Sequence, residues 1–490
     1  MLSLLVTLSM YFTNAQEKKP NIIYILADDL GYGDVSIFNK ESKINTSNID
    51  RLARSGMRFT DAHSGSAVCT PTRYGIMTGR YAWRSKLTSG VTWSYDSALI
   101  EPSRKTIALL LKQEGYSTAC IGKWHLGLNW QKGNKGNIDL FQSIKRGPTT
   151  MGFDYFYGIT ASLDIPPYVY ILNDRITATS IDTIQATTGK GFWRKGPIGN
   201  DFKHEEVMSA FIDSSINFIR QQAKINHPFF LYLPLAAPHT PILPTSAYLG
   251  KSNTNEYGDF VLMVDDMIGK IMGEVKKAGI EENTMIVFTS DNGCSPQANF
   301  KELENVGHHP SYVYRGAKAD IYEGGHRVPF IVKWPSVIKP NGVSDKTISL
   351  TDFFATINDL FNQTIEDNSG EDSYSILPLL TGNVKNHKRT DVVNHSIEGN
   401  FAIRKGKWKL EFCPGSGGWS YPTPSETKSL SLPVIQLYNL KRDSSEQHNV
   451  YAKHPGIVKK LTTLMESQID NGRSTPGSHQ QNAVQVKLMK

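Results

Sequence analysis

Continuous apolar runs separated by amphipathic stretches dominate the first two thirds of this 490-residue sequence. The run at 21–27 is rich in β-branched residues, which is typical of a strand buried on both faces of a parallel sheet. Similar runs predict strands at 117–121, 229–233, 284–289 and 330–333. Apolar residues spaced three or four apart predict helices at 47–53, 103–114, 205–222 and 257–278. Strands that alternate with helices predict an α/β fold with a doubly wound, mostly parallel sheet flanked by helices.

After about residue 385 the pattern changes to shorter segments. Alternating residues predict two strands joined by a turn at 401–410 and a further strand at 435–440, and a helix is expected at 456–469. We therefore expect a large domain at 20–384, a small C-terminal α+β domain at 385–470, and a polar, frayed tail at 471–490.

The chain starts with an apolar run at 1–10 that is too short to span a bilayer. Small residues follow it, in a pattern similar to a secretory cleavage site near Ala15. A signal peptide at 1–15 and a secreted or periplasmic location are expected; the alternative is a buried N-terminal strand. No other segment suggests a membrane span.

Composition narrows the class of protein. With 39% hydrophobic and 20% charged residues, the chain is neither collagen-like, disordered nor a polytopic membrane protein. The net charge of +7 has no concentrated basic block, so it suits an anionic substrate and does not predict nucleic-acid binding. Four cysteines are too few for a disulfide scaffold.

Polar side chains follow two of the expected strands at the edge where ligands bind in open α/β sheets. Asp28 and Asp29 come after the first strand, and Asp291 and Asn292 come after the strand at 284–289. Carboxylate and amide oxygens are the ligands that Ca²⁺ prefers. Either pair alone also fits a turn in which the side chains bond the backbone. Both pairs together favour a four-oxygen cation site.

Cys69-Thr70-Pro71-Thr72-Arg73 predicts the start of a helix, because proline suits the first turn. Cys69 would lie at the helix N-terminus, where unpaired amides favour anions, and Arg73 would offer a bidentate fork to an oxyanion one turn later. The alternative for Cys69 is a small buried residue without chemistry.

More basic side chains occur close to other strands. Lys123 and His125 alternate after the strand at 117–121 and would point to one side. His239 follows another strand and Lys318 precedes a third. Each alone fits a structural or surface role. Together with the carboxylates and Cys69 they are the parts needed to bind an oxyanion on a cation and transfer it through a covalent step.

These motifs resemble the formylglycine-dependent, type I sulfatases of the alkaline-phosphatase-like superfamily. Cys69–Arg73 with Thr78-Gly79-Arg80 is similar to the first family signature, and Gly115-Tyr116 through Gly122–Gly127 is similar to the second. Asp28-Asp29 and three further motifs follow in family order: Pro238-His239-Thr240-Pro241, Asp291-Asn292-Gly293 and Glu323-Gly324-Gly325. The resemblance runs from about residue 20 to at least 450, so the expected domain at 20–384 would be the sulfatase catalytic domain. Thr72 stands where many members have serine, and it keeps the hydroxyl.

The resemblance implies an alkaline-phosphatase-like fold and conversion of Cys69 to formylglycine (3-oxoalanine). A formylglycine-generating or anaerobic maturation enzyme would be the partner for that step. The resemblance also implies one Ca²⁺ ion, with the ligands Asp28, Asp29, Cys69, Asp291 and Asn292. The side chains expected around the sulfate are Arg73, Lys123, His125, His239 and Lys318.

The same resemblance implies a two-step hydrolysis. A hydroxyl of the formylglycine hydrate attacks sulfur, and the sugar oxygen leaves with a proton from His239 or Lys318. His125 then helps to expel inorganic sulfate. The physical chemistry agrees with this scheme. Cations must offset the negative charge of a sulfate ester before a nucleophile approaches. A geminal diol can release the bound sulfate through its second hydroxyl, whereas a thiol could form a stable adduct.

A sulfated carbohydrate is the expected substrate, either algal, such as ulvan or carrageenan, or a glycosaminoglycan. Aromatic faces in loops stack on sugar rings, although core packing is the commoner role of tryptophan. The loop tryptophans are Trp83, Trp93, Trp130, Trp193 and Trp419. The candidate substrate-binding residues are Ser162, His308, His309 and Arg315.

Three alternative functions remain open. The first is an arylsulfatase of broad specificity. The second is a phosphatase or phosphodiesterase of the same superfold, which would need a serine or threonine nucleophile and more zinc ligands. The third is a non-catalytic carbohydrate-binding homologue in which Cys69 stays unmodified.

Overall fold

The computed structural model describes residues 19–134 and 136–489, so the expected signal peptide at 1–15 lies outside the described residues. The large domain is built on one sheet, whose strands are β1 (Asn21–Ala27), β2 (Met57–Phe59), β4 (Ser117–Lys123), β5 (Tyr155–Ile159), β6 (Ile171–Leu172), β7 (Arg175–Ile176), β10 (Phe229–Pro234), β11 (Thr284–Ser290), β12 (Phe330–Lys333) and β13 (Gly342–Ser344). None of the helices in this part of the chain is long and apolar enough to cross a membrane.

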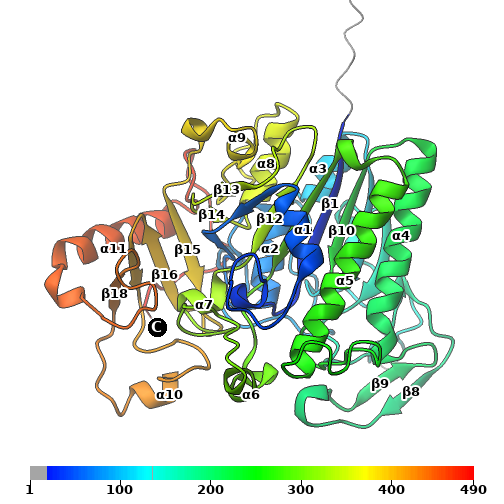
Figure 1. The fold of residues 1–490 in the computed structure, drawn as a ribbon, viewed down its shortest axis with the longest axis horizontal. Helices are drawn as coiled ribbons and strands as arrows, with labels where there is room; N and C mark the ends of the chain where they lie inside the picture. Colours follow the sequence, from blue (N-terminus) through cyan, green and yellow to red (C-terminus); the bar gives the residue numbers. More distant parts are fainter. Residues whose placement is uncertain (1–18, 135, 490) are drawn as a thin grey trace, which may run out of the picture.

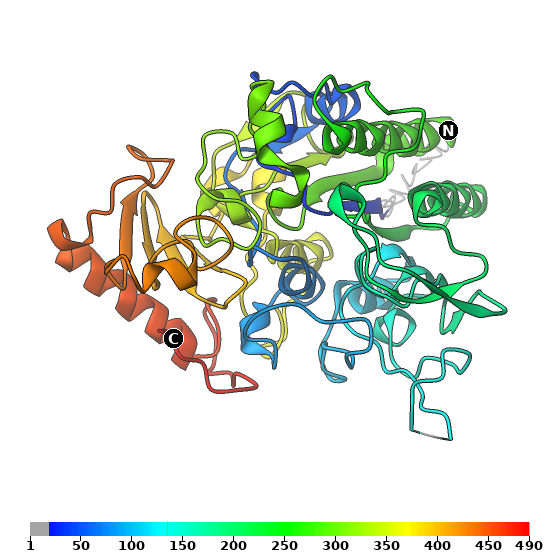
Figure 2. The same ribbon diagram turned by 90° about the horizontal axis from the view of Figure 1, so that it is seen from below.

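The sheet is mostly parallel, as expected (Figure 1). Its order is β13-β2-β12-β11-β1-β10-β4-β5-β6-β7, and neighbours from β11 through β5 are parallel. β12 is antiparallel to both of its neighbours, and β6 and β7 form an antiparallel edge. The five parallel strands at the centre all end on the same side of the sheet. Figure 2 looks at the molecule from that side, from below the view of Figure 1.

Helices cover both faces of the sheet, which confirms the doubly wound architecture. Alternate residues of β1 show the two layers: Tyr24 packs in one core cluster and Ile23 in the other. The first layer contains α2 (Cys69–Thr78), α3 (Ile107–Gln113) and α8 (Asp352–Leu360). The second contains α1 (Ser47–Arg54), α4 (Val207–Ile225) and α5 (Glu256–Lys277), with α4 beside α5 in front of the sheet in Figure 1.

The C-terminal domain is an antiparallel four-stranded sheet with one helix against it, at the left of Figure 1. Its elements are β15 (Asp391–His395), β16 (Phe401–Lys405), β17 (Trp408–Glu411), β18 (Gln436–Asn439) and α11 (Pro455–Asp470). The remaining short elements are β3 (Ala62–His63), β8 (Ile181–Ile184), β9 (Gly196–Gly199), α6 (Phe300–Asn305), α7 (Glu323–His326), β14 (Ile348–Ser349), α9 (Leu377–Leu380) and α10 (Pro424–Thr427).

The C-terminal tail is not frayed, which corrects the expectation from its polar composition. The backbone N–H of Ala483 donates to the carbonyl of Arg84 at 2.7 Å, and Arg80 Nη2 donates to the carbonyl of Gln481 at 3.0 Å. Val486 packs against the core of the small domain. The tail thus supplies acceptors for donors of the two buried arginines that follow α2: Gln481 for Arg80 and Asn482 for Arg84.

The start of one helix differs from the sequence-based expectation for a local reason. The helix expected at 103–114 begins at Ile107, because the Thr106 side chain accepts from the Leu109 N–H and caps it. α1 begins at Ser47, as expected, and the side chain of its N-cap residue Thr46 makes no capping hydrogen bond. The first amides of α1 donate instead to Asp265 of α5, for example from the Ile49 N–H at 2.8 Å.

Replacing the Thr106 cap tests this helix start. Thr106→Ala removes the acceptor for the Leu109 N–H at 3.1 Å and is expected to lower the free energy of unfolding by about 1 kcal/mol. A urea unfolding curve followed by circular dichroism measures the change. The control is Thr188→Ala, at an exposed threonine that precedes a short helical turn without capping it, and it should leave the midpoint unchanged. Equal losses in both variants would contradict the capping role.

Candidate active site

The carboxyl ends of β1 and β11 bring four oxygen-bearing side chains together. Asp28 and Asp29 continue β1, Asp291 and Asn292 continue β11, and all four are buried. Because the two strands pair up to their last residues, the segments that follow them meet. Asn292 Nδ2 donates to Asp29 Oδ1 at 2.7 Å, and the Asp29 N–H donates to Asp291 Oδ1 at 3.2 Å. The grouping predicted for these residues is therefore present.

Cys69 and Arg73 reach the same place from α2. Arg73 Nε and Nη2 donate to Asp291 Oδ2 at 3.1 and 2.7 Å, and Nη1 donates to the Lys123 carbonyl at 2.9 Å. Burial raises the pKa of the Cys69 thiol, although Lys123 and Lys318 oppose the shift. Unmodified, Cys69 is a protonated thiol and a poor nucleophile near pH 7.

Two buried lysines balance the aspartates. Lys123 Nζ lies 2.7 Å from Asp28 Oδ2, and Lys318 Nζ lies 2.7 Å from Asp29 Oδ1. Burial alone would raise the pKa of Asp28, but Lys123 and the other nearby cations hold it well below its usual range. Burial would lower the pKa of Lys318, yet Asp29 raises it above the ordinary value. Asp28 is therefore ionised and Lys318 protonated near pH 7.

The two histidines present nitrogen atoms with defined roles. His125 Nε2 lies 2.8 Å from the Thr92 carbonyl, which only accepts, so Nε2 carries the proton. His125 Nδ1 is buried and has no hydrogen-bond partner among the described residues. His239 Nδ1 donates to the Thr240 carbonyl, and its Nε2 lies 3.6 Å from Asp29 Oδ2.

Both rings are neutral near pH 7. Burial, followed by the repulsion of Lys123, lowers the pKa of His125 well below its usual range. Burial and Lys318 lower the pKa of His239. The free nitrogen of each ring can therefore accept a proton or a hydrogen bond.

The oxygen cluster fits a hard cation such as Ca²⁺. Asp28 Oδ1 and Asn292 Oδ1 are buried and lack hydrogen-bond partners within residues 19–134 and 136–489, although Arg73 Nη2 lies 3.5 Å from Asp28 Oδ1. Unpartnered buried oxygens are costly unless something binds them. Asp28, Asp29 and His239 also offer ligand atoms within 4.8 Å of one another. Carboxylate and amide oxygens are the donor set of calcium sites.

The four candidate substrate-binding residues have different surroundings. His308 is fully buried, its Nε2 2.8 Å from Asp34 Oδ1, so it stabilises the loop after β1 instead of facing a ligand. His309 is exposed. Arg315 donates to the Glu446 carbonyl at 2.9 Å and thus joins the two domains. Ser162 is buried in the loop that follows β5.

No signal in the sequence pointed to Thr92, which orients His125. Its contribution is mainly through backbone atoms, and its side chain also donates to the His125 carbonyl at 3.2 Å. A backbone acceptor has no residue-type signature, so only the fold identifies it.

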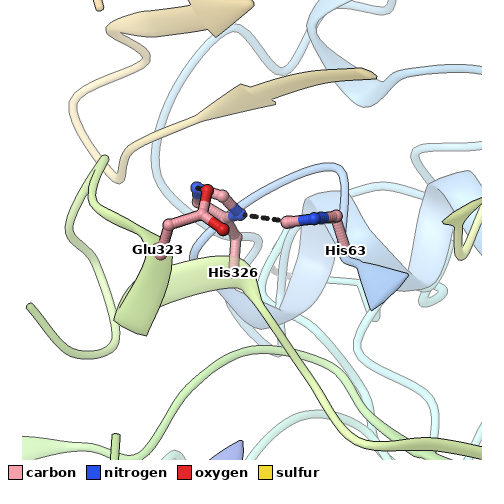
Figure 3. A group of neighbouring side chains, drawn as sticks. All are labelled: His63, Glu323 and His326. Carbon is pink, nitrogen blue, oxygen red and sulfur yellow. Dashed lines mark hydrogen bonds and ion pairs between the residues drawn. The ribbon is translucent and has the colours of Figure 1, made fainter. Parts of the chain in front are cut away.

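A second group of possible metal ligands joins the two domains (Figure 3). His63 of β3 and Glu323 and His326 of α7 offer ligand atoms within 4.8 Å of one another. Their atoms already have partners: the two Nδ1 atoms lie 3.1 Å apart, and Lys409 and Arg327 pair with the Glu323 carboxylate at 3.3 and 3.0 Å. Lys409 belongs to β17, so we interpret this group as an ion-pair network between the domains.

Comparison with known proteins identifies similar sequences and folds over most of the chain. The sulfatase family profile matches residues 20–363. An N-acetylgalactosamine-6-O-sulfatase of Bacteroides thetaiotaomicron is 34% identical, with 92% of this chain and 93% of that protein covered. A solved structure from a study of glycosaminoglycan metabolism in B. thetaiotaomicron has a TM-score of 0.81 at 32% identity, covering 92% and 99%. A structure with bound neocarrahexaose, named Ps i-CgsB, has a TM-score of 0.70 at 25% identity, covering 94% and 95%.

Proposed function

Because the chain belongs to the sulfatase family and is a sulfuric ester hydrolase, we propose that it removes the 6-O-sulfate from N-acetylgalactosamine residues of glycosaminoglycan fragments. The proposal depends mainly on one observation: the side chains of Asp28, Asp29, Asp291, Asn292 and Cys69 are buried together at the carboxyl ends of the strands. The chain is also similar to an N-acetylgalactosamine-6-O-sulfatase over nearly its whole length.

The protein's own side chains have distinct tasks in this proposal. Arg73 is fixed by Asp291, so it presents its charge to the sulfate group without reorganising. Lys318 is protonated and can donate a proton to the leaving sugar oxygen. His125 keeps Nδ1 free to accept a proton, because Thr92 holds its other nitrogen. The neutral state of His239 supports Lys318 as the proton donor.

Two groups complete the proposed site. Formylglycine made from Cys69 would supply the nucleophilic oxygen as its hydrate, through the action of a maturation enzyme. A Ca²⁺ ion held by the four oxygen-bearing residues and the modified Cys69 would offset the negative charge of the sulfate. The unmodified thiol of Cys69 would be a weak nucleophile at neutral pH, because burial raises its pKa.

The apolar segment at 1–10 supports export of the protein, which fits an extracellular or periplasmic polysaccharide substrate. A sulfated galactan such as carrageenan is the second candidate substrate, on the basis of the 25%-identical structure with bound neocarrahexaose.

A substrate panel tests the proposed activity. We expect sulfate release from a 6-sulfated N-acetylgalactosamine disaccharide, with kcat/KM at least about 100-fold above that for the 6-phosphate analogue. A calcium chelator should suppress the release, and added Ca²⁺ should restore it. Faster zinc-dependent phosphate release would contradict the proposal, and exclusive action on carrageenan fragments would replace the glycosaminoglycan substrate with a galactan.

A further inference from the structure

Only some of the loop tryptophans considered from the sequence are available to a ligand. Trp93 and Trp419 are 48% and 44% exposed, whereas Trp83 and Trp130 are buried. Trp193 stacks on the buried His204 with ring centroids 4.3 Å apart. Trp93 directly follows Thr92, whose carbonyl accepts from His125.

Trp93 directly follows Thr92, the residue that orients His125. The Thr92 N–H donates to Thr70 Oγ1 at 3.2 Å, and the Thr92 carbonyl accepts from His125 Nε2 at 2.8 Å. Thr70 directly follows Cys69. Trp93 therefore directly follows a residue that is bonded both to α2, which carries Cys69, and to His125, and its own ring is exposed.

The guanidinium of Arg194 stacks over the Trp93 ring, and Asp164 holds Arg194 in place. Its guanidinium carbon lies 5.1 Å from the Trp93 ring centroid and 5.1 Å from that of Phe192. Its Nη1 pairs with Asp164 Oδ2, and its backbone N–H donates to the Asp164 carbonyl at 3.2 Å. Asp164 is 7% exposed, whereas the Arg194 side chain is 39% exposed.

One side of the Arg194 guanidinium group is available to a ligand. Neither Nε nor Nη2 has a hydrogen-bond partner within the part of the chain that the structure describes. These two nitrogens form one edge of the guanidinium fork, which matches a carboxylate or sulfate group in a bidentate manner. The buried Asp164 fixes the direction in which this edge points.

The same loop also touches the other side of the site. The Lys190 carbonyl accepts from Thr240 Oγ1 at 2.9 Å and from the Ile242 N–H at 2.8 Å. Thr240 follows His239 and accepts from its ring. The segment from Lys190 to Arg194 therefore connects the two sides of the active site that carry His125 and His239.

We propose that Arg194, stacked on Trp93 and supported by Asp164, determines specificity by binding a carboxylate or sulfate group on the sugar next to the sulfated residue. The proposal rests on the proposed function and narrows it to substrates with an acidic neighbouring sugar. The Trp93 ring would pack against that sugar, and Nε and Nη2 of Arg194 would bind its charged group. In this proposal Arg194 binds the neighbouring sugar and takes no part in the transfer of the sulfo group.

Arg194→Met tests the proposal, with four substrates that share the 6-sulfated N-acetylgalactosamine. These are a disaccharide with a neighbouring uronate, the same disaccharide after carboxyl reduction, a disaccharide whose neighbouring sugar carries a sulfate instead, and the monosaccharide. We expect KM for the charged disaccharides to rise about 10- to 100-fold with little change in kcat. The reduced disaccharide and the monosaccharide should change less than about twofold.

Matched variants make the result decisive. Arg220→Met removes another half-exposed arginine paired with a buried carboxylate, Glu274, and should leave all four substrates unaffected. Arg194→Lys keeps the charge without the fork and should recover only part of the affinity. An equal loss on charged and uncharged substrates, or no loss on any, would overturn the proposal. Failure of the unaltered enzyme on all four would instead overturn the proposed function.

Discussion

Cys69→Ala is expected to lower kcat for sulfate release from the 6-sulfated disaccharide by at least about 10³-fold, as loss of a covalent nucleophile does in other enzymes. The variant loses the precursor of the proposed nucleophilic oxygen. It keeps Arg73, which stays bound to Asp291, so KM should change much less than kcat. Ion chromatography of released sulfate measures the effect.

The matched control is Cys413→Ala, a buried cysteine in the small domain that should leave kcat unchanged. Mass spectrometry of the Cys69 peptide from the unaltered protein, made in its native host, provides an independent test. Exchange of the sulfur for an aldehyde oxygen is expected at this position. An unmodified thiol in fully active protein would contradict the proposed nucleophile.

Asp28→Asn is expected to abolish calcium binding and lower kcat/KM by at least about 100-fold. Asp28 is the carboxylate that pairs with Lys123 through one oxygen and leaves the other without a hydrogen-bond partner. An amide keeps the shape but loses the charge that a divalent cation requires. For the unaltered protein, Ca²⁺ at 100 times its Kd should add about 2.7 kcal/mol of stability, which the variant should not gain.

Calcium titrations followed by thermal unfolding, together with metal analysis of the dialysed protein, measure this effect. Asp470→Asn, at an exposed carboxylate at the end of α11, should retain both the bound metal and the stabilisation. If Asp28→Asn keeps its calcium-dependent stabilisation, the proposed ligand set is wrong.

Much of the site could be predicted from the sequence because parallel strands end at a common edge. Asp28 and Asp291 are 263 positions apart, yet each directly follows a strand, and β1 and β11 are neighbours. Their meeting required only that both strands be recognised and belong to one sheet. The apolar runs made that recognition straightforward, since strands buried on both faces have few polar positions.

The parts that could not be predicted depend on partners distant in sequence. Capping of α1 by Asp265 has no local signature, because the acceptor comes from α5. Nor could local composition show that His308 pairs with Asp34 in the core, since adjacent histidines in a loop are usually exposed. Arg194 was missed because its importance depends on the positions of Trp93 and Asp164.

The return of the C-terminal tail to the arginines beyond α2 has a consequence for the timing of biosynthesis. Arg80 acquires its contact with Gln481 only when residue 481 has been made. At ribosomal speeds of about 5–20 residues per second, roughly 20–80 s separate the synthesis of Cys69 from that of Gln481. During that interval the contacts of the segment that follows α2 are incomplete, which would give the proposed maturation enzyme a period in which to reach Cys69 before folding ends.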